Sequence, residues 1–409
     1  MSLSLFACDD TFDKSSNNLE SGATTAATTV ATTAADPDPD LTPDPTPDPT
    51  PDPTPDPNNG DNNEPKEIKN IILILGDGMG LEHISAGQLY VGKKFAFTDW
   101  QFTNVNTDSV NTSGKGSVLT DSAASGTALA TGHLTVNSYI GKNHLGTNVT
   151  TILDAALALN KSTGVVTTDT LHGATPAAFS GHSINRNNSA EIANSQISSG
   201  VNLLCGDTDS VYSSRRTAFE GEGYAYCDNF NSLNSTFTSS KALWQLNLEG
   251  TGTIVPLSDT TVKALEYLDQ DPDGFVLMVE QAHIDKYSHN NDFAGMVKSV
   301  KSLNDTVEAI MNWIGDRTDT AVLITADHET GGLTVSNTPN ALSSNYTSSL
   351  SNSKIYYNFS SGNHTNSQVG LFVYGIEPDF SKYSYYGSHH LIKNINVYNL
   401  MYDILNPSE

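Results

Sequence analysis

The 409-residue sequence has few basic residues, few cysteines and no long hydrophobic stretch. Twenty Lys and Arg against 46 Asp and Glu give a formal net charge of −26, which argues against nucleic acid as a main or regulatory partner. The longest apolar runs, such as residues 71–75, are far shorter than the roughly 18 residues that a membrane span needs. No transmembrane helix is therefore predicted.

Proline is concentrated near the start of the chain. Ten of the 17 prolines and seven acidic residues lie in residues 36–57, where Thr-Pro-Asp-Pro repeats, and a Ser/Thr/Ala-rich tract precedes them. Polyproline-like segments whose charges repel each other are extended spacers. Residues 9–65 are therefore predicted to be a disordered tether, and residues 66–409 a folded domain. A solvated tail that serves only solubility is the alternative.

The three cysteines bear on localisation. Residues 5–8, Leu-Phe-Ala-Cys, resemble the end of a bacterial lipoprotein signal, so residues 1–8 are interpreted as its remnant and Cys8 as a membrane tether. An incidental Cys8 is the alternative. Cys205 and Cys227 lie in a Gly-, Asp- and Tyr-rich segment that is predicted to be a loop. A disulfide between them would fit an oxidising compartment, and two free thiols are the alternative. We expect an exported protein, periplasmic or at the cell surface.

From residue 67 onward, strand and helix signals alternate. This order predicts an α/β fold with a large central, mostly parallel sheet and helices on both faces. Five apolar runs are predicted to be buried strands: residues 71–75, 164–167, 275–279, 321–325 and 369–374. Residues 295–314 are predicted to be a helix. Its apolar residues recur at three- and four-residue steps, namely Met296, Val300, Leu303, Val307, Ile310 and Ile314.

Potential metal ligands lie next to four of these five strands, where open α/β sheets bind their ligands. They are Asp77, Glu280, Asp285, His289, Asp327, His328 and His364. Such a mixture of oxygen and nitrogen donors suits zinc, together with a harder ion such as magnesium. Each residue has a plainer interpretation: Asp77 as a helix cap, Asp285 and His289 as a surface pair, His364 as a loop histidine. Their convergence on the strand ends favours a metal centre.

Ser122 is the candidate nucleophile. It precedes a run of small helix-forming residues and would lie at a helix N-terminus, where free N–H groups and the helix dipole favour an alkoxide or a phosphate. A serine that only caps the helix is the alternative. The sequence contains no Gly-x-Ser-x-Gly elbow, which favours activation by a metal over activation by histidine.

Six motifs in order resemble the alkaline phosphatases, over residues 69–406. They are GDGMG at 76–80, TDSAASGTALATG at 120–132, ATPAAF at 174–179, VEQAHIDKYSH at 279–289, TADHETGG at 325–332 and HTNSQ at 364–368. The resemblance implies that Asp285, His289 and His364 hold one zinc, and that Asp77, Asp327 and His328 hold a second beside Ser122. It further implies one magnesium on Asp77, Thr175 and Glu280, and a phosphate-gripping Arg186.

The reaction that the resemblance implies is hydrolysis of small phosphate monoesters with broad specificity, through a phosphoserine on Ser122, in a homodimer. Two rival functions remain open. One is a phosphodiesterase or sulfatase of the same superfamily, and the other is a noncatalytic metal-binding surface lipoprotein.

One residue departs from the family pattern. Gly173 stands where the family usually has Asp or His near the magnesium, and Lys286 matches members that pair this lysine with that Asp. We therefore expect Lys286 to be free to reach bound phosphate, directly or through water. We also expect Gly173→Asp to pair with the lysine, and His172 to compensate at the magnesium from one residue away.

Overall fold

The structure is a computed structural model that describes residues 67–248, 253–339, 342, 344–384 and 390–407. The described residues belong to one unit, Glu64–Glu409. The predictions for residues 1–8 and 9–65, including Cys8 and the tether, lie outside the described residues.

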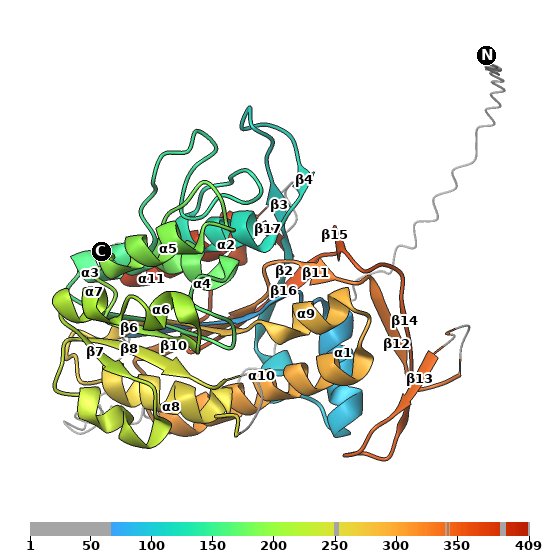
Figure 1. Ribbon diagram of the computed structural model, residues 1–409. Helices are drawn as coiled ribbons and strands as arrows, with labels where there is room; N and C mark the ends of the chain where they lie inside the picture. Colours follow the sequence, from blue (N-terminus) through green and yellow to red (C-terminus); the bar gives the residue numbers. More distant parts are fainter. Residues whose placement is uncertain (1–66, 249–252, 340–341, 343, 385–389, 408–409) are drawn as a thin grey trace, which may run out of the picture. The chain divides into compact units, whose positions relative to one another are not determined.

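A sheet of ten strands runs through the centre of the described part (Figure 1). In spatial order the strands are β17 (Leu391–Lys393), β2 (Gln101–Asn106), β16 (Val369–Tyr374), β10 (Thr320–Thr325), β1 (Asn70–Gly76), β9 (Phe275–Gln281), β5 (Ser162–Thr167), β6 (Leu203–Asp207), β8 (Lys241–Leu246) and β7 (Tyr224–Cys227). Only β16 runs antiparallel to its neighbours, β10 and β2, among these pairs. The predicted α/β fold with a mostly parallel sheet is confirmed.

The five predicted strands correspond to β1, β5, β9, β10 and β16. β1 shows why an apolar run forms a central strand: every residue of Asn70–Gly76 is buried, and the strand pairs with β10 on one side and β9 on the other. Burying one Ile or Leu side chain contributes roughly 1.5–3 kcal/mol. The run is therefore most stable where helices cover both faces of the strand.

Helices cover both faces of the sheet (Figure 1). On the upper face in this view lie α2 (Ser122–Thr131), α3 (Ile152–Ala158), α4 (Ala174–Ser180), α5 (Ser189–Ile197) and α11 (Ile395–Leu405). On the lower face lie α1 (Leu81–Val91), α8 (Leu257–Leu268) and α10 (Phe293–Ile314). Among the short helices, α6 (Ser210–Ser213) follows β6, α7 (Arg216–Gly221) follows α6, and α9 (His283–His289) follows β9.

The predicted helix 295–314 is α10, which begins two residues earlier than predicted. The Asp292 side chain caps it by accepting a hydrogen bond from the Gly295 N–H at 3.0 Å, and Gly315 ends it at a φ of 51°. All six residues of the predicted apolar stripe are buried against the core. None of the helices in the described part is both long and apolar enough to cross a membrane.

The expected Cys205–Cys227 disulfide is absent, and both cysteines are free and buried. They lie in β6 and β7, not in a loop, and both are in register with Trp244 of β8, which runs between those strands. Strands two apart are about 10 Å apart, beyond the roughly 7 Å between Cα atoms that a disulfide spans. The segment looked like a loop because β7 is an edge strand of only four residues, two of them partly exposed, within a Gly-, Asp- and Tyr-rich sequence.

Smaller strands frame the region beyond the sheet. A three-stranded antiparallel sheet of β12 (Leu333–Ser336), β14 (Lys354–Phe359) and β13 (Ser344–Thr347) stands beside α1 (Figure 1). The two-residue strands β11 (Glu329–Thr330) and β15 (His364–Thr365) pair with each other, as do β3 (Asp108–Ser109) and β4 (Val118–Leu119). The β11–β15 pair brings His364 next to the residues that follow β10.

Candidate active site

Asp77 lies at the end of β1, in the tight turn Gly76-Asp77-Gly78. Gly78 has a φ of 72°, and a Cβ there would lie 2.9 Å from the Cα of Asp285, so only glycine lets β1 approach α9 this closely. Asp77 does not cap α1, whose N-cap is Gly80. Its buried Oδ1 has no hydrogen-bond partner, which leaves a carboxylate oxygen that a cation would satisfy.

Asp285, His289 and His364 form the first donor group. Asp285 and His289 lie one turn apart on α9, with 3.3 Å between Oδ2 and Nε2, and His364 Nε2 lies 3.2 Å from His289 Nε2. Two nitrogens bound to one zinc at about 2.05 Å in tetrahedral geometry would stand about 3.3 Å apart. The spacing of these donors therefore fits one zinc ion.

The other ring nitrogens of the two histidines are held by the backbone. His289 Nδ1 lies 2.8 Å from the Gly362 carbonyl oxygen, and His364 Nδ1 lies 2.8 Å from that of Thr120. A carbonyl only accepts, so each Nδ1 donates, and in the neutral ring Nε2 keeps its lone pair for a metal. Without a cation, the hydrogen bond to Asp285 raises the pKa of His289 to about 9, so a metal would have to displace that proton.

The second donor group consists of Asp77, Asp327 and His328. His328 Nε2 lies 3.6 Å from Asp77 Oδ1 and 3.2 Å from Asp327 Oδ2, and that Oδ2 is also buried without a hydrogen-bond partner. Burial and the charges of Asp327 and Asp285 raise the pKa of Asp77 well above its usual value. Asp285 belongs to both groups, since its carboxylate also lies close to Asp77 and His328.

Ser122 is the first residue of α2 and faces the second group, with its Oγ 3.1 Å from His328 Nε2. The cap of α2 is Asp121, which accepts a hydrogen bond from the Ala124 N–H at 2.9 Å, so the capping interpretation of Ser122 is wrong. Arg186 Nη1 lies 3.2 Å from Asp121 Oδ2. One carboxylate therefore caps the start of α2 and holds Arg186, and it belongs to the residue next to Ser122.

The resemblance assigns Asp77, Thr175 and Glu280 to a third group, and in the structure the charge of Glu280 acts on Asp77. Thr175 lies on α4, which packs against β9, and its buried Oγ1 has no hydrogen-bond partner. Glu280 lies in β9 and accepts a hydrogen bond from the hydroxyl of Thr167. Burial, followed by the charge of Asp169, raises the pKa of Glu280 to about 8. These buried oxygen donors fit a hard cation such as magnesium.

The expectation that Lys286 is free is wrong. Its Nζ lies 2.7 Å from Oδ1 of Asp169, a residue that follows β5. A Cβ at Gly173 would lie only 2.6 Å from Asp169 Oδ2, so a side chain introduced there by Gly173→Asp would collide with a carboxylate already present. His172 Nε2 lies 2.7 Å from Asp209 instead. The carboxylate of Asp169, four residues upstream, thus fills the space beside Gly173.

Sequence reasoning missed three residues of the site. Asp121 and Thr330 lie inside two of the motifs, and Thr330 donates its hydroxyl proton to Asp285. Asp169 lies beyond the predicted strand 164–167, the one strand to which no ligand was assigned. The rule that placed ligands beyond the other strands would have found Asp169 as well.

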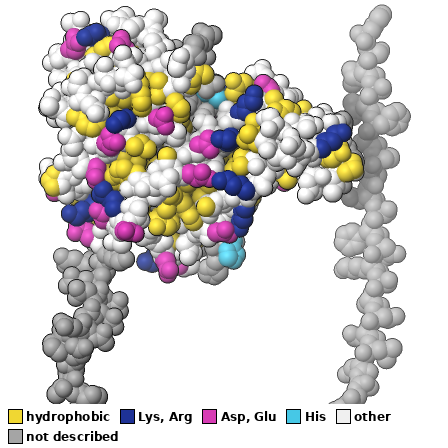
Figure 2. Space-filling model, turned by 90° about the horizontal axis from the view of Figure 1, so that it is seen from below, with side chains coloured by type: hydrophobic (Ala, Val, Ile, Leu, Met, Phe, Trp, Pro, Cys, Tyr) yellow, Lys and Arg dark blue, Asp and Glu magenta, His cyan; other side chains and the backbone are white. Residues whose placement is uncertain are grey.

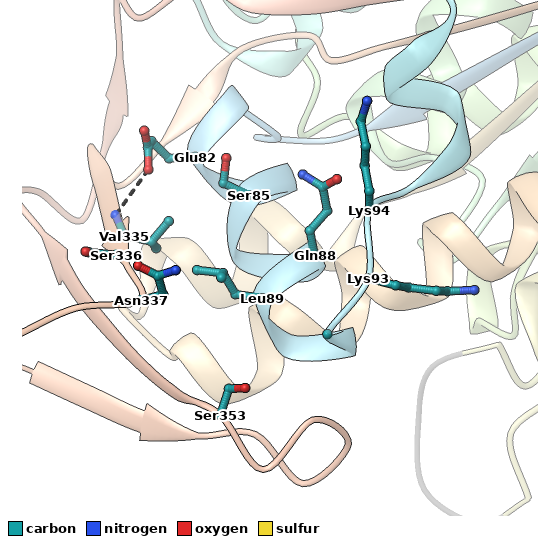
Figure 3. A pocket seen from close by; sticks show the side chains of 11 residues that line it. Glu82, Ser85, Gln88, Leu89, Lys93, Lys94, Val335, Ser336, Asn337 and Ser353 are labelled. Atoms are coloured by element: carbon teal, nitrogen blue, oxygen red, sulfur yellow. Dashed lines mark hydrogen bonds between the residues drawn. The ribbon is translucent and has the colours of Figure 1, made fainter.

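A groove lined by described residues lies elsewhere, between α1 and β12 (Figure 3). It encloses about 740 Å³ and contains none of the site residues. Glu82 accepts a hydrogen bond from the Val335 N–H across it, and Lys93 pairs with Glu308 at 2.9 Å. Because its charged side chains are already paired, the groove lacks converging reactive groups.

Comparison with known proteins matches the segments that contain these site residues. The alkaline phosphatase family model matches residues 68–208 and 236–390. Alkaline phosphatase 4 of Bacillus subtilis strain 168 is 33% identical over 301 residues, which cover 66% of this chain and 63% of that protein. Alkaline phosphatase of Escherichia coli K12 is 29% identical over 333 residues, covering 64% of this chain and 70% of that protein.

Among solved structures, alkaline phosphatase from the Antarctic bacterium TAB5 superposes with a TM-score of 0.71 and 26% identity, covering 84% of this chain and 100% of that one. The matched segment spans 63% of the length of the Bacillus subtilis relative. The model match covers most of the chain, and the fold agrees with it. The chain belongs to the alkaline phosphatase family.

Proposed function

We propose that the protein hydrolyses phosphate monoesters with broad specificity through a phosphoserine on Ser122. The observation that carries this proposal is the position of the Ser122 Oγ, at the N-terminus of α2 and 3.1 Å from His328 in a group of buried carboxylates and imidazoles. A phosphoryl group bound there would meet the positive end of the helix and the Arg186 guanidinium.

The reaction consists of two successive displacements at phosphorus. The Ser122 Oγ bonds to phosphorus, the ester oxygen departs and takes up a proton, and the phosphoserine remains. Water then attacks phosphorus, which restores the serine hydroxyl and releases inorganic phosphate. Arg186, oriented by Asp121, binds two phosphoryl oxygens with its planar fork in both steps. Because these contacts reach only the phosphoryl group, little of the alcohol is recognised.

The donor groups would hold two zinc ions and one magnesium ion. Asp285, His289 and His364 would hold the first zinc, and the second would lie on Asp77, Asp327 and His328, with magnesium on Asp77, Thr175 and Glu280. When bound, such cations lower the pKa of a serine hydroxyl and stabilise charge on the entering and leaving oxygens. The unpartnered buried oxygens of Asp77, Asp327 and Thr175 support this assignment.

The test compares three esters at alkaline pH with the metal content measured in parallel. p-Nitrophenyl phosphate should turn over much faster than bis-p-nitrophenyl phosphate or p-nitrophenyl sulfate. A preference for the diester or the sulfate would instead support the related superfamily activities. Bound metal without turnover of any ester would favour a noncatalytic metal-binding protein.

The remaining sequence predictions stay proposals. We propose that the protein is exported to the periplasm or cell surface, is tethered to the membrane through Cys8, acts as a homodimer and has small phosphate monoesters as its partners, not nucleic acid. The lipoprotein-like residues 5–8 and the net charge of −26 support this. Cell fractionation of Cys8→Ser, with light scattering of the purified protein, tests the tether and the dimer.

A further inference from the structure

Asp169 lies in a turn that is held rigidly after β5. Its backbone N–H donates to the Thr167 hydroxyl at 2.9 Å, and its carbonyl oxygen accepts from the Asp207 N–H at 2.7 Å at the end of β6. Its carboxylate accepts a hydrogen bond from the Thr170 N–H at 2.8 Å. These contacts fix both the backbone and the side chain of Asp169 before any ligand binds.

Asp169 is linked to Lys286 through its carboxylate and to the magnesium-fitting group through its backbone. Oδ1 holds Lys286 Nζ at 2.7 Å, on the residue next to Asp285. The Thr167 hydroxyl that accepts from the Asp169 backbone also donates to Glu280. Asp169 is therefore connected to Glu280 through one hydroxyl, and directly to the lysine beside the first donor group.

Gly173 makes room for this carboxylate. Its φ of −51° and ψ of 152° suit any L-amino acid, so backbone conformation does not require glycine here. Space does, because a Cβ would lie 2.6 Å from Asp169 Oδ2 and 3.0 Å from the Thr170 carbonyl oxygen. Gly173 and Asp169 therefore act as one unit, in which the glycine leaves the volume that the aspartate fills.

We propose that Asp169 is a positioning residue of this active site, which holds Lys286 away from bound phosphate and adds negative charge beside the magnesium-fitting group. The inference deepens the proposed phosphatase function and rests on it. A lysine tied to Asp169 contributes little to phosphate binding, so the product leaves readily. A lysine released from Asp169 would clamp phosphate in substrate and product alike.

The first experiment replaces the carboxylate in the full-length, metal-loaded protein. Asp169→Ala and Asp169→Asn should lower the inhibition constant of inorganic phosphate by about two- to fivefold, the strength of one partly exposed ion pair. They should lower KM and kcat together, because product release slows. Asp305→Ala, which removes an exposed carboxylate paired with Lys301 on α10, is the matched control and should change neither constant.

A double-mutant cycle shows whether the effect passes through the lysine. In a Lys286→Ala background, Asp169→Ala should leave phosphate inhibition unchanged. If Asp169→Ala changes the inhibition constant of phosphate equally with and without Lys286, Asp169 does not act through the lysine and the proposal is overturned. The proposal is also overturned if Asp169→Ala and the natural protein have the same inhibition constant.

Moving the carboxylate from residue 169 to residue 173 distinguishes a specific role of this carboxylate from a general loss of structure. Gly173→Asp alone should reduce stability and activity, because its side chain collides with Asp169. Adding Asp169→Ala removes the collision and returns a carboxylate to the same space, so the double variant should recover phosphate inhibition near the original value. A double variant worse than both single variants would contradict the shared-space argument.

Two binding measurements separate this proposal from the proposed function. Calorimetric titration with Mg²⁺ should show about two- to fivefold weaker binding in Asp169→Ala, since one nearby negative charge is lost. Equilibrium dialysis with inorganic phosphate should show tighter binding. If the natural protein hydrolysed no monoester, the proposed function would fail. Unchanged affinities for both ions would reject the role of Asp169 itself.

Discussion

In His289, His364 and His328, one ring nitrogen forms a hydrogen bond with another group of the protein, and the other ring nitrogen faces the candidate site. Backbone carbonyl oxygens hold Nδ1 of His289 and His364, and the Thr330 hydroxyl lies 3.2 Å from Nδ1 of His328. Such outer contacts fix ring orientation and ligand basicity. Three imidazoles are thus oriented before a metal arrives.

Ser122→Ala should abolish phosphoenzyme formation and reduce turnover by at least about a thousandfold, since the nucleophile is lost. Zinc content should stay nearly unchanged, because the carboxylate and imidazole ligands remain. Acid-quenched protein analysed by mass spectrometry, with metals measured by plasma emission, checks both outcomes. Ser113→Ala, in an exposed turn, is the control. A phosphoprotein in the Ser122→Ala variant would remove Ser122 as nucleophile.

The buried ionisable groups predict how pH affects the metal-free protein. Burial and Asp169 raise the pKa of Glu280 from 4.5 to about 8. Its contribution to stability is therefore fully present below pH 4.5 and is lost as pH rises through about 8. The hydrogen bond to Asp285 raises the pKa of His289 to about 9, and this contribution is also lost as pH rises.

The melting temperature of the chelated protein should therefore fall from pH 5 to pH 9 relative to that of the metal-loaded protein, in which cations balance the carboxylates. Thermal unfolding followed by circular dichroism, with and without chelator, measures the gap at each pH. A gap that stays constant over this range would contradict the assignment of these groups to metal sites.

Individual residues could be predicted where they stand beside an apolar run or inside a motif. Glu280 lies in β9, Asp77 and Asp327 follow β1 and β10, and the structure places both aspartates near His328 Nε2. The pairing of Asp169 with Lys286 could not be predicted in the same way. It depends on the free volume above Gly173, which is a property of the folded turn.

At the scale of elements, α9 is positioned by its contact with α10. A Cβ at Gly295, in the first turn of α10, would lie 2.3 Å from the ring of Tyr287 in α9. The ring lies directly on the glycine backbone, and Asp285 and His289 flank Tyr287 on the same helix. The packing of these two helices therefore sets the position of the first donor group.

Gly295→Ala should destabilise the protein, even though alanine favours helices by up to about 1 kcal/mol. Displacing the Tyr287 ring costs about 1–3 kcal/mol, which outweighs that gain. The variant should also bind zinc more weakly, because α9 moves. Gly221→Ala is the matched control, since nothing lies within 4 Å of a Cβ there, and it should be neutral or slightly stabilising. Melting temperatures and zinc titrations compare the two variants, and equal melting temperatures would refute the packing argument.

Burial favours the prediction of a strand without ensuring it, since β6 and β8 are mostly buried and were not predicted. β1, β9 and β10 lie in the centre of the sheet and are continuous apolar runs, so burial alone selects them. The edge strand β7 and the three-stranded sheet of β12, β13 and β14 are only partly buried and were not predicted either. Half-exposed strands are chosen by their neighbours, which a single sequence does not display.

At the scale of the whole molecule, the net charge of −26 is unevenly distributed along the sequence. Thirteen of the 46 acidic residues precede Pro65, against one lysine. The face seen in Figure 2 carries Lys and Arg beside Asp and Glu, with hydrophobic side chains between them. Mixed charges of this kind produce little long-range repulsion. The folded part is thus less acidic than the average of the chain suggests.

Deleting residues 1–65 should leave kcat and KM for p-nitrophenyl phosphate unchanged. The deleted part contains no site residue, and the donor groups and their hydrogen-bond partners lie among residues 77–365. Steady-state kinetics of the purified deletion variant check this. A folded but inactive variant would show that the first 65 residues contribute to the site or to a subunit contact.

The positions of Cys205 and Cys227 on either side of Trp244 have a consequence for where this fold can form. No disulfide joins elements of the described part, so noncovalent contacts stabilise it. Burial raises the pKa of the Cys205 thiol far above its usual value, which keeps it protonated and slow to oxidise. The described part therefore reaches this fold with both thiols unbonded, so no oxidant is needed to join these two strands.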